Sequence, residues 1–470
     1  MSNLLKLYHH APYPLRVLAA SARGYYLRRW RYGPETDQVI DEALEREYWS
    51  PQKWNSWQKE RLAYMLHRSA TKVPFYSEHW SARRRRGDKV SWEYLENWPI
   101  LRKESVRERP HAFVADDCDI QRMFPDHTSG TTGKPLHLWL NRKTVREWYG
   151  INEARVKMWN GVSRIDRWAI LGGQLIVPYE QTHPPFWVWN AGLQQLYMSS
   201  YHLATEFVPT YFEAMHKYKI TYILGYASSM YSLAQIGREC NIEPPIIQVA
   251  ISNAETLYQH QRDLISEVFQ CPTVDTYGMV ELVAAASECN KGSLHLWPEV
   301  GIVEVMHPND DTQLLSGEIG RFVCTGLLNC DMPLIRYDVG DLGALSSNGK
   351  ECICHRTLPI IQHIEGRTDD IVITPDGRRV GRLGPVFRGD LPIREVQITQ
   401  ESLESIQVRI VSAPGYTAST GEVIVQRLRE RLGNMEISLE LVEKIPRSAN
   451  GKFRVVVSKL TREQQQLKNR

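Results

Sequence analysis

The sequence lacks a long apolar run. Its apolar stretches are short and interrupted by charge, and none approaches the roughly 20 consecutive apolar residues of a membrane-spanning helix. The first residues carry no clear signal-peptide pattern. We therefore expect a cytoplasmic protein rather than a secreted or integral membrane protein.

Cysteine is sparse as well. Eight cysteines are spread over 470 residues, mostly within apolar segments. Such a distribution does not form the dense framework of a disulfide-stabilised domain, and it fits a reducing compartment.

The chain also lacks an excess of charge of one sign. Its 57 basic side chains stand against 54 acidic ones, so the formal net charge is only +3. This balance argues against a nucleic-acid partner, which requires a broad positive field. The exception is the basic and aromatic segment from Tyr8 to Tyr32. It favours a solvated helix on the main domain, with weak peripheral contact to an anionic membrane as the alternative. No pattern fixes an oligomeric state.

What the sequence does contain is enough apolar material, 42% of its residues, for more than one core. Helical spacing dominates up to residue 120, and βαβ alternation of short apolar runs and amphipathic segments follows. Strand patterns, including the segment ECICHRT, then suggest an antiparallel β subdomain. We expect an α/β fold with a helical segment over 1–120, a core over 121–368 and a small α+β domain over 369–470.

The run TSGTTGKP, Thr128 to Pro135, is the hardest stretch to explain by folding alone. Glycines let backbone N–H groups approach an anion, hydroxyls add donors, and the lysine adds charge. The Walker pattern does not fit, because Thr128 replaces its first glycine and Pro135 its closing Ser or Thr. The run therefore predicts a polyphosphate site with a different ATP chemistry. The alternative is an ordinary polar surface loop.

Further motifs follow in order: SNAETL, YGMVE, PLIRYDVGD, GRTDD and IPRSANGKF. With these motifs the chain resembles the adenylate-forming superfamily of acyl- and aryl-CoA synthetases over most of its length. Its closest branch looks like the phenylacetate-CoA ligase family, and within it the ligase-like proteins associated with capsular polysaccharide biosynthesis. The resemblance implies a large N-terminal domain and a small, mobile C-terminal domain, with Asp369 as the hinge.

The resemblance also implies a site for ATP and Mg²⁺. Lys134, Glu281 and Lys452 would be catalytic, with Glu281 binding Mg²⁺ and Lys452 reaching in from the small domain. The nucleotide contacts would be Thr128, Ser129, Gly130, Thr131, Thr132, Gly133, Ala254, Glu255, Tyr277, Gly278, Asp341 and Arg367. The substrate carboxylate is itself the nucleophile, so such a site needs no general base and must mainly cancel phosphate charge.

Three functions follow as hypotheses. The first is adenylation of a small carboxylic acid and transfer to a thiol, with CoA as the expected acceptor and AMP and pyrophosphate as products. The second keeps the adenylation and delivers the acyl group to an amine in polysaccharide biosynthesis. The third is a non-catalytic nucleotide-binding scaffold, since Val280 stands where many relatives carry a hydroxyl residue that contacts the α-phosphate.

Two further sets of residues are candidates for binding. Family position suggests an acyl pocket around Gly172 and Gly173, with Tyr201, His202, Tyr226 and Ser228, although such side chains also pack in cores. The spacings C-x5-H and C-x-C could supply four ligands for a structural zinc ion, namely Cys289, His295, Cys352 and Cys354. The spacing alone favours reduced core cysteines and a hydrogen-bonded histidine, because C-x-C is not the usual C-x2-C knuckle.

Overall fold

The computed structural model describes residues 3–128, 136–178, 181–346, 352–367, 372–375, 379–380, 383–387, 391–447 and 453–461. The chain divides into two compact units. The first comprises Met1–Val339 with Ala344–Gln362, and the second comprises Gly340–Gly343 with His363–Arg470. Within the described residues, no helix is long and apolar enough to cross a membrane.

The chain begins with helices. They are α1 (Asn3–His10), α2 (Tyr13–Arg31), α3 (Thr36–Arg46), α4 (Pro51–Lys72), α5 (Pro74–Arg85) and α6 (Lys103–Glu108). Ser50 caps α4 by accepting a hydrogen bond from the Lys53 amide, and proline stands at the first position of α4 and α5, where its missing N–H costs nothing.

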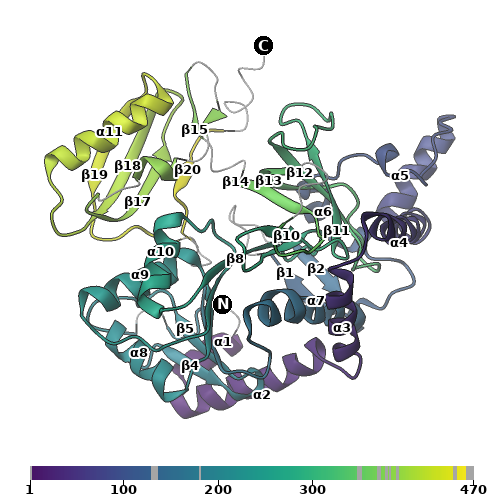
Figure 1. Ribbon diagram of the computed structural model, residues 1–470. Helices are drawn as coiled ribbons and strands as arrows, with labels where there is room; N and C mark the ends of the chain where they lie inside the picture. Colours follow the sequence, from purple (N-terminus) through teal and green to yellow (C-terminus); the bar gives the residue numbers. More distant parts are fainter. Residues whose placement is uncertain are drawn as a thin grey trace. The chain divides into compact units, whose positions relative to one another are not determined.

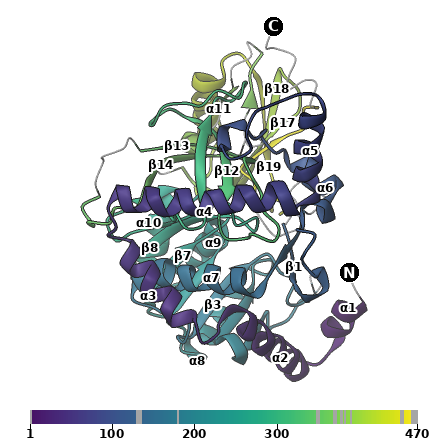
Figure 2. The same ribbon diagram turned by 90° about the vertical axis from the view of Figure 1, so that its right-hand side faces the viewer.

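The long helix α4, seen at full length in Figure 2, is fixed to the β part of the first unit by its polar side chains. Gln58 donates to the Pro298 carbonyl oxygen and Arg61 to that of Leu327. Two turns beyond Arg61, Arg68 pairs with Asp331 at 2.8 Å.

Among the described residues, 12 strands form one sheet in the order β11-β12-β13-β14-β10-β9-β8-β7-β6-β3-β5-β4. Strands β5, β3, β6, β7 and β8 are parallel neighbours, whereas β8-β9-β10-β14 and β11-β12 pair antiparallel. The first six strands in chain order are β3 (Trp168–Gly172), β4 (Trp187–Asn190), β5 (Gln195–Ser199), β6 (Tyr222–Gly225), β7 (Val249–Ser252) and β8 (Thr273–Gly278). The others are β9 (Ala285–Glu288), β10 (Leu294–Leu296), β11 (Gly301–Met306), β12 (Gly320–Gly326), β13 (Tyr337–Leu345) and β14 (Ile360–Arg367).

Helices cover both faces of the parallel strands (Figure 1). On one face α8 (Val208–Lys217), α9 (Ala227–Glu239) and α10 (Gln259–Phe269) build a core around Phe212 and Phe269. On the other face α3 and α7 (Arg142–Asn152) contribute Ile40 and Ile151. Strands buried on both faces explain the short apolar runs without alternation, and the predicted α/β class is confirmed.

The second unit contains its own small sheet, in the order β19-β18-β17-β20. Its elements are β15 (Val372–Ile373), β16 (Arg379–Val380), β17 (Ile393–Gln400), β18 (Ser405–Ser412), α11 (Ala418–Leu432), β19 (Glu436–Leu441) and β20 (Val456–Ser458). Ile398 and Val408 from the sheet pack with Ile424 and Leu428 from α11. The expected small α+β module is therefore present.

One sequence expectation about a strand was wrong. The segment ECICHRT was expected to be a strand, but Cys352 to Thr357 forms a turn and an irregular stretch before β14. His355 adopts a left-handed φ of 63°, and its amide donates to the Cys352 carbonyl oxygen at 2.9 Å. The alternation that suggested a strand here comes from the cysteines, whose side chains contact residues outside this segment.

A buried ion pair links separate parts of the first unit. The fully buried Arg155 donates two hydrogen bonds to the Glu299 carboxylate, at 2.6 and 2.7 Å, and a third to the Ala43 carbonyl oxygen in α3. Arg155 also lies 3.9 Å from the Glu47 carboxylate. Because these groups are buried, removal of one partner would leave the other charge without the compensation that water gives at the surface.

We expect Arg155→Met to lower the free energy of unfolding by about 3–5 kcal/mol, since it leaves the Glu299 carboxylate buried without its partner. Urea denaturation would measure this. The matched control is Arg238→Met, which breaks an exposed pair with Glu267 and should cost at most about 1 kcal/mol. Equal losses in the two variants would contradict the prediction.

Candidate active site

The TSGTTGKP run falls in the sequence between two paired strands. Strands β1 (Phe124–His127) and β2 (His137–Leu140) pair antiparallel, and of the run itself the structure describes Thr128. The amide of Thr128 donates to the Leu136 carbonyl oxygen at 3.0 Å, and the Leu136 amide donates to Thr128 Oγ1 at 3.0 Å. The buried Thr128 is thus linked to Leu136 by two hydrogen bonds that extend the pairing of β1 and β2.

Several predicted residues fall outside the described part of the chain. They are Ser129, Gly130, Thr131, Thr132, Gly133, Lys134, Asp369 and Lys452. Arg367 ends β14, and only its backbone is described. Asp341 is half-buried in β13, in the stretch that groups with the second unit. The roles assigned to these residues stay predictions.

Most of the other predicted residues meet at one edge of the large sheet. Strands β3, β5, β6, β7 and β8 run parallel, so their carboxyl ends lie at the same edge, which is where open α/β sheets bind ligands. The segments that follow these ends carry Tyr201, His202, Tyr226, Ser228, Ala254, Glu255 and Glu281, and β8 itself ends with Tyr277 and Gly278.

Two of these segments are joined directly. Glu255 Oε2 accepts a hydrogen bond from the Ser228 amide, in the first turn of α9, at 3.0 Å. A carboxylate at this position also complements the positive end of the helix dipole. The preceding residue, Ala254, has a left-handed φ of 61°, which turns the chain sharply after β7. The predicted adenine-binding segment and the predicted acyl-binding segment are therefore neighbours.

Three tyrosines surround the turn after β3. Tyr201 Oη donates to the Gly173 carbonyl oxygen at 3.0 Å, and burial raises the pKa of Tyr201. Burial, together with the nearby Glu255 charge, raises the pKa of Tyr226 to about 12. At Gly172 an added Cβ would lie 2.7 Å from the hydroxyl oxygen of Tyr197, so only glycine fits beside that ring. The hydroxyls of Tyr201 and Tyr226 therefore stay protonated at neutral pH and can donate hydrogen bonds.

His202 and Ser228 are both buried. His202 Nδ1 lies 2.8 Å from Ser199 Oγ, and its ring stacks on Phe186 with centroids 4.5 Å apart. These contacts hold the His202 ring in the core beneath the carboxyl edge of the parallel strands. The Ser228 hydroxyl, in contrast, has no hydrogen-bond partner among the described residues, so it could still bind a ligand.

Glu281 has two partners that the sequence analysis missed. Its Oε1 accepts hydrogen bonds from Lys103 Nζ at 2.9 Å and from Tyr337 Oη at 3.0 Å, and the carboxylate is buried. Lys103 begins α6 and precedes Glu281 by 178 residues. No motif surrounds Lys103, so no sequence signal pointed to it. A buried, oriented carboxylate suits a Mg²⁺ ligand.

The neighbouring strand β8 contains a buried carboxyl group with a shifted pKa. Burial, reinforced by the Glu288 carboxylate, raises the pKa of Asp275 to about 7. Glu288 is in turn held by Arg262 at 2.9 Å and by the Asp275 amide. Asp275 is therefore partly protonated near neutral pH, two residues before Tyr277.

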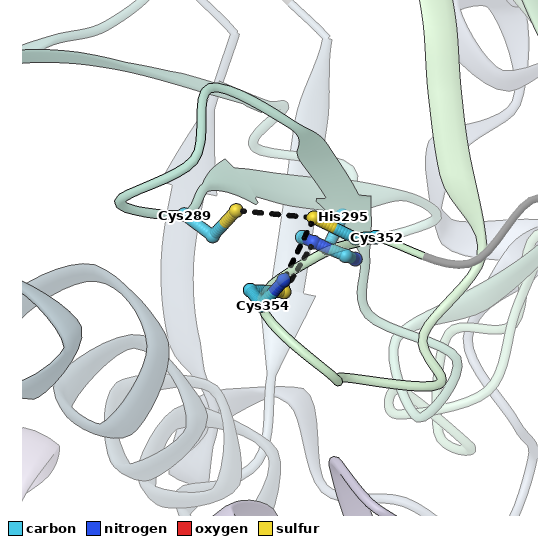
Figure 3. Close-up of side chains that lie close together, drawn as sticks. All are labelled: Cys289, His295, Cys352 and Cys354. Atoms are coloured by element: carbon cyan, nitrogen blue, oxygen red, sulfur yellow. Dashed lines mark hydrogen bonds between the residues drawn. The ribbon is translucent and has the colours of Figure 1, made fainter.

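The four candidate zinc ligands come together in the first unit. Figure 3 shows Cys289, His295, Cys352 and Cys354 pointing toward one another. Their ligand atoms all lie within 4.8 Å of one another. The cysteines are free of disulfides, and this clustering favours the metal interpretation over that of separate core residues.

The chain is similar in sequence to several known proteins. The family model of the CapK C-terminal domain matches residues 372–459. The sequence is 25% identical to protein CapK of Staphylococcus aureus, over 97% of this chain and 99% of that protein. It is 24% identical to a phenylacetate-coenzyme A ligase of Escherichia coli, over 67% of this chain and 71% of the ligase.

A solved structure extends the likeness to the fold. The 2-hydroxyisobutyryl-CoA ligase in its postadenylation state superposes with a TM-score of 0.68 at 20% identity, covering 90% of this chain and 93% of the ligase. At this identity the likeness describes the fold alone. Together with the two sequence relatives, it bears out the resemblance to the adenylate-forming superfamily.

We expect Asp275→Asn to stabilise the protein increasingly as the pH rises from about 4 to about 7. In this interval the unfolded carboxyl group, with a pKa near 3.9, releases its proton while the folded one retains it, so the wild type loses stability. The difference should then level off above the folded pKa. Thermal unfolding over a pH series measures it, with the exposed Asp263→Asn on α10 as control. A difference that is independent of pH would refute the assignment.

Proposed function

We propose that this chain, a homologue of CapK and of the phenylacetate-CoA ligases in the adenylate-forming superfamily, is an AMP-forming acid–thiol ligase. It would activate a carboxylic acid with ATP and pass the acyl group to a thiol, with CoA as the expected acceptor. The observation that carries the proposal is the gathering of Glu255, Tyr277 and Glu281 at the carboxyl edge of the parallel strands. The expected compartment is the cytoplasm.

In the first half-reaction a carboxylate oxygen of the acid would attack the α-phosphorus of ATP, and pyrophosphate would leave. The chain's task is then to orient the two anions and to neutralise charge. The backbone amides of residues 129–133 and the Lys134 ammonium would hold the β- and γ-phosphates. Lys452 would balance the charge that develops on the α-phosphate.

The described residues fit a magnesium ion. Glu281 offers a buried carboxylate, and its partners Lys103 and Tyr337 fix its orientation. Bound Mg²⁺ would neutralise phosphate charge. Lys103, whose ammonium lies 2.9 Å from Glu281 Oε1, would keep that carboxylate oriented.

In the second half-reaction the thiol would lose its proton and its sulfur would displace AMP from the acyl-adenylate. Lys452 would have to leave the site before the thiol enters, which the predicted hinge at Asp369 would permit. Val280 has no hydroxyl group to donate to the α-phosphate, so this hydrogen bond would have to come from another residue or be missing.

A second candidate keeps the adenylation and changes the acceptor to an amine. The likeness to CapK favours it, because that protein matches nearly the whole chain, whereas the ligase of Escherichia coli matches 67% of it. An amine on a sugar or sugar nucleotide would then displace AMP and form an amide, as expected for an enzyme of polysaccharide biosynthesis.

The decisive experiment measures acid-dependent release of pyrophosphate over a panel of aryl, fatty, amino and sugar acids. We expect at least one acid to support turnover, and Lys452→Ala and Glu281→Gln to reduce it by about 100-fold or more, because each removes charge stabilisation from the transition state. ATP should still bind to Lys452→Ala. The matched control is Lys459→Ala, from the same region of the chain, whose ammonium pairs with Glu401.

The acceptor is identified by repeating the assay with CoA and with amino sugars. A thioester product supports the acid–thiol ligase, whereas turnover that ignores CoA and needs an amine supports the amide ligase. Tight ATP binding without pyrophosphate release from any acid would leave the non-catalytic scaffold as the function.

The N-terminal helix α2 supports a further partner. Leu15 and Leu18 are 55% and 66% exposed, and Arg23, Arg28 and Arg29 follow on the same helix. We infer weak peripheral binding to an anionic membrane. The double variant Leu15→Ser/Leu18→Ser should lower the fraction that sediments with phosphatidylglycerol vesicles, whereas Leu315→Ser, at a leucine elsewhere that is 77% exposed, should not. Unchanged sedimentation of the double variant would rule the contact out.

A further inference from the structure

We propose that Cys289, His295, Cys352 and Cys354 bind one structural zinc ion. This site is separate from the one proposed for the nucleotide, and zinc binding does not require the chain to be a ligase. Four side chains from two segments converge here, their ligand atoms lie at distances that suit a metal ion, and a hydrogen bond orients the histidine.

Two short segments supply the ligands in pairs. Cys289 directly follows β9 and His295 lies in β10, so both belong to one antiparallel hairpin. The Gly292 amide closes the hairpin turn on the Cys289 carbonyl oxygen at 2.9 Å. Cys352 and Cys354 lie in the turn before β14, and β14 pairs with β10. The pairing of these strands brings residues about 60 positions apart into one cluster.

The distances fit a tetrahedral ion. With a Zn–S bond of about 2.3 Å, two sulfurs of a tetrahedron lie about 3.8 Å apart, and a sulfur and an imidazole nitrogen about 3.6 Å apart. Cys289 Sγ and Cys352 Sγ are separated by 3.8 Å, and Cys354 Sγ and His295 Nε2 by 3.3 Å. A disulfide between the first pair would need about 2.05 Å.

The histidine is oriented as a zinc ligand. His295 Nδ1 lies 3.2 Å from the Leu358 carbonyl oxygen, which can only accept a hydrogen bond, so the proton resides on Nδ1 and Nε2 presents its lone pair to the cysteines. The ring is fully buried and meets Trp159 edge-on at 5.9 Å. A metal ligand of this kind normally carries such a second hydrogen bond.

Four protein ligands in a largely buried cluster leave no open position, so the ion would be structural rather than catalytic. Its consequence is mechanical. The bound turn continues into Arg356, whose guanidinium pairs with Glu47 at 2.7 Å, and Thr357, whose amide donates to the Glu47 carbonyl oxygen. Zinc would thereby fasten the segment that leads into β14 to both the β9–β10 hairpin and the end of α3.

Elemental analysis of the purified full-length chain tests the proposal. We expect about one zinc per chain, and a loss of most of it in Cys354→Ser and in Cys289→Ser, since three remaining ligands bind far more weakly than four. The matched control is Cys240→Ser, because Cys240 is half-buried like Cys354 and its sulfur lies only near the Thr205 carbonyl oxygen. The control should retain the zinc.

A second measurement does not depend on the folding of variants. Wild-type protein treated with a mercurial thiol reagent should release zinc in proportion to the thiols modified, and protein refolded with Co²⁺ should show the charge-transfer absorption of cobalt–thiolate bonds. Wild-type protein that is folded and free of metal after purification with zinc present would overturn the proposal. Iron in place of zinc, or a Cys289–Cys352 disulfide, would overturn it as well.

Discussion

The parallel pairing of β5, β3, β6, β7 and β8 is the constraint on which the candidate active site depends. Parallel strands require crossover segments that return the chain to the same starting edge, and here α8, α9 and α10 lie in these crossovers. Each of these five strands therefore ends at the same edge of the sheet. There the backbone leaves the sheet, and its polar groups become available to bind a ligand. Residues separate in the sequence, such as Ser228 and Glu255, become neighbours through this topology.

The sequence could predict this arrangement because each site segment follows a short apolar run. Glu255 comes after the run that forms β7, and Glu281 after the run that forms β8, but the resemblance to a known family was what identified them as site residues. The same logic fails for Lys103. It belongs to a six-residue helix far from any motif, and only tertiary folding brings its ammonium to Glu281. The raised pKa of Asp275 was equally invisible, since it depends on burial and on a cross-strand carboxylate.

The cysteine cluster illustrates the opposite case. Its spacing argued for separate core residues, because C-x-C is too short for the usual knuckle. A turn at Cys352 brings the two cysteines together despite the short spacing, and within it the Cys354 amide donates to Cys352 Sγ at 3.5 Å. Sequence spacing cannot reveal such a turn, particularly where apolar alternation predicts a strand instead. Strand pairing between β10 and β14 then decides which cysteines meet.

Gly172 and Tyr197 form a pair whose sizes depend on each other. The tyrosine hydroxyl occupies the volume that a methyl group at position 172 would need, so a larger residue at position 172 would have to displace the tyrosine ring. A larger residue on β3 at this position would therefore require a smaller one at position 197 on β5, so the spacing of these two neighbouring strands limits both side chains together.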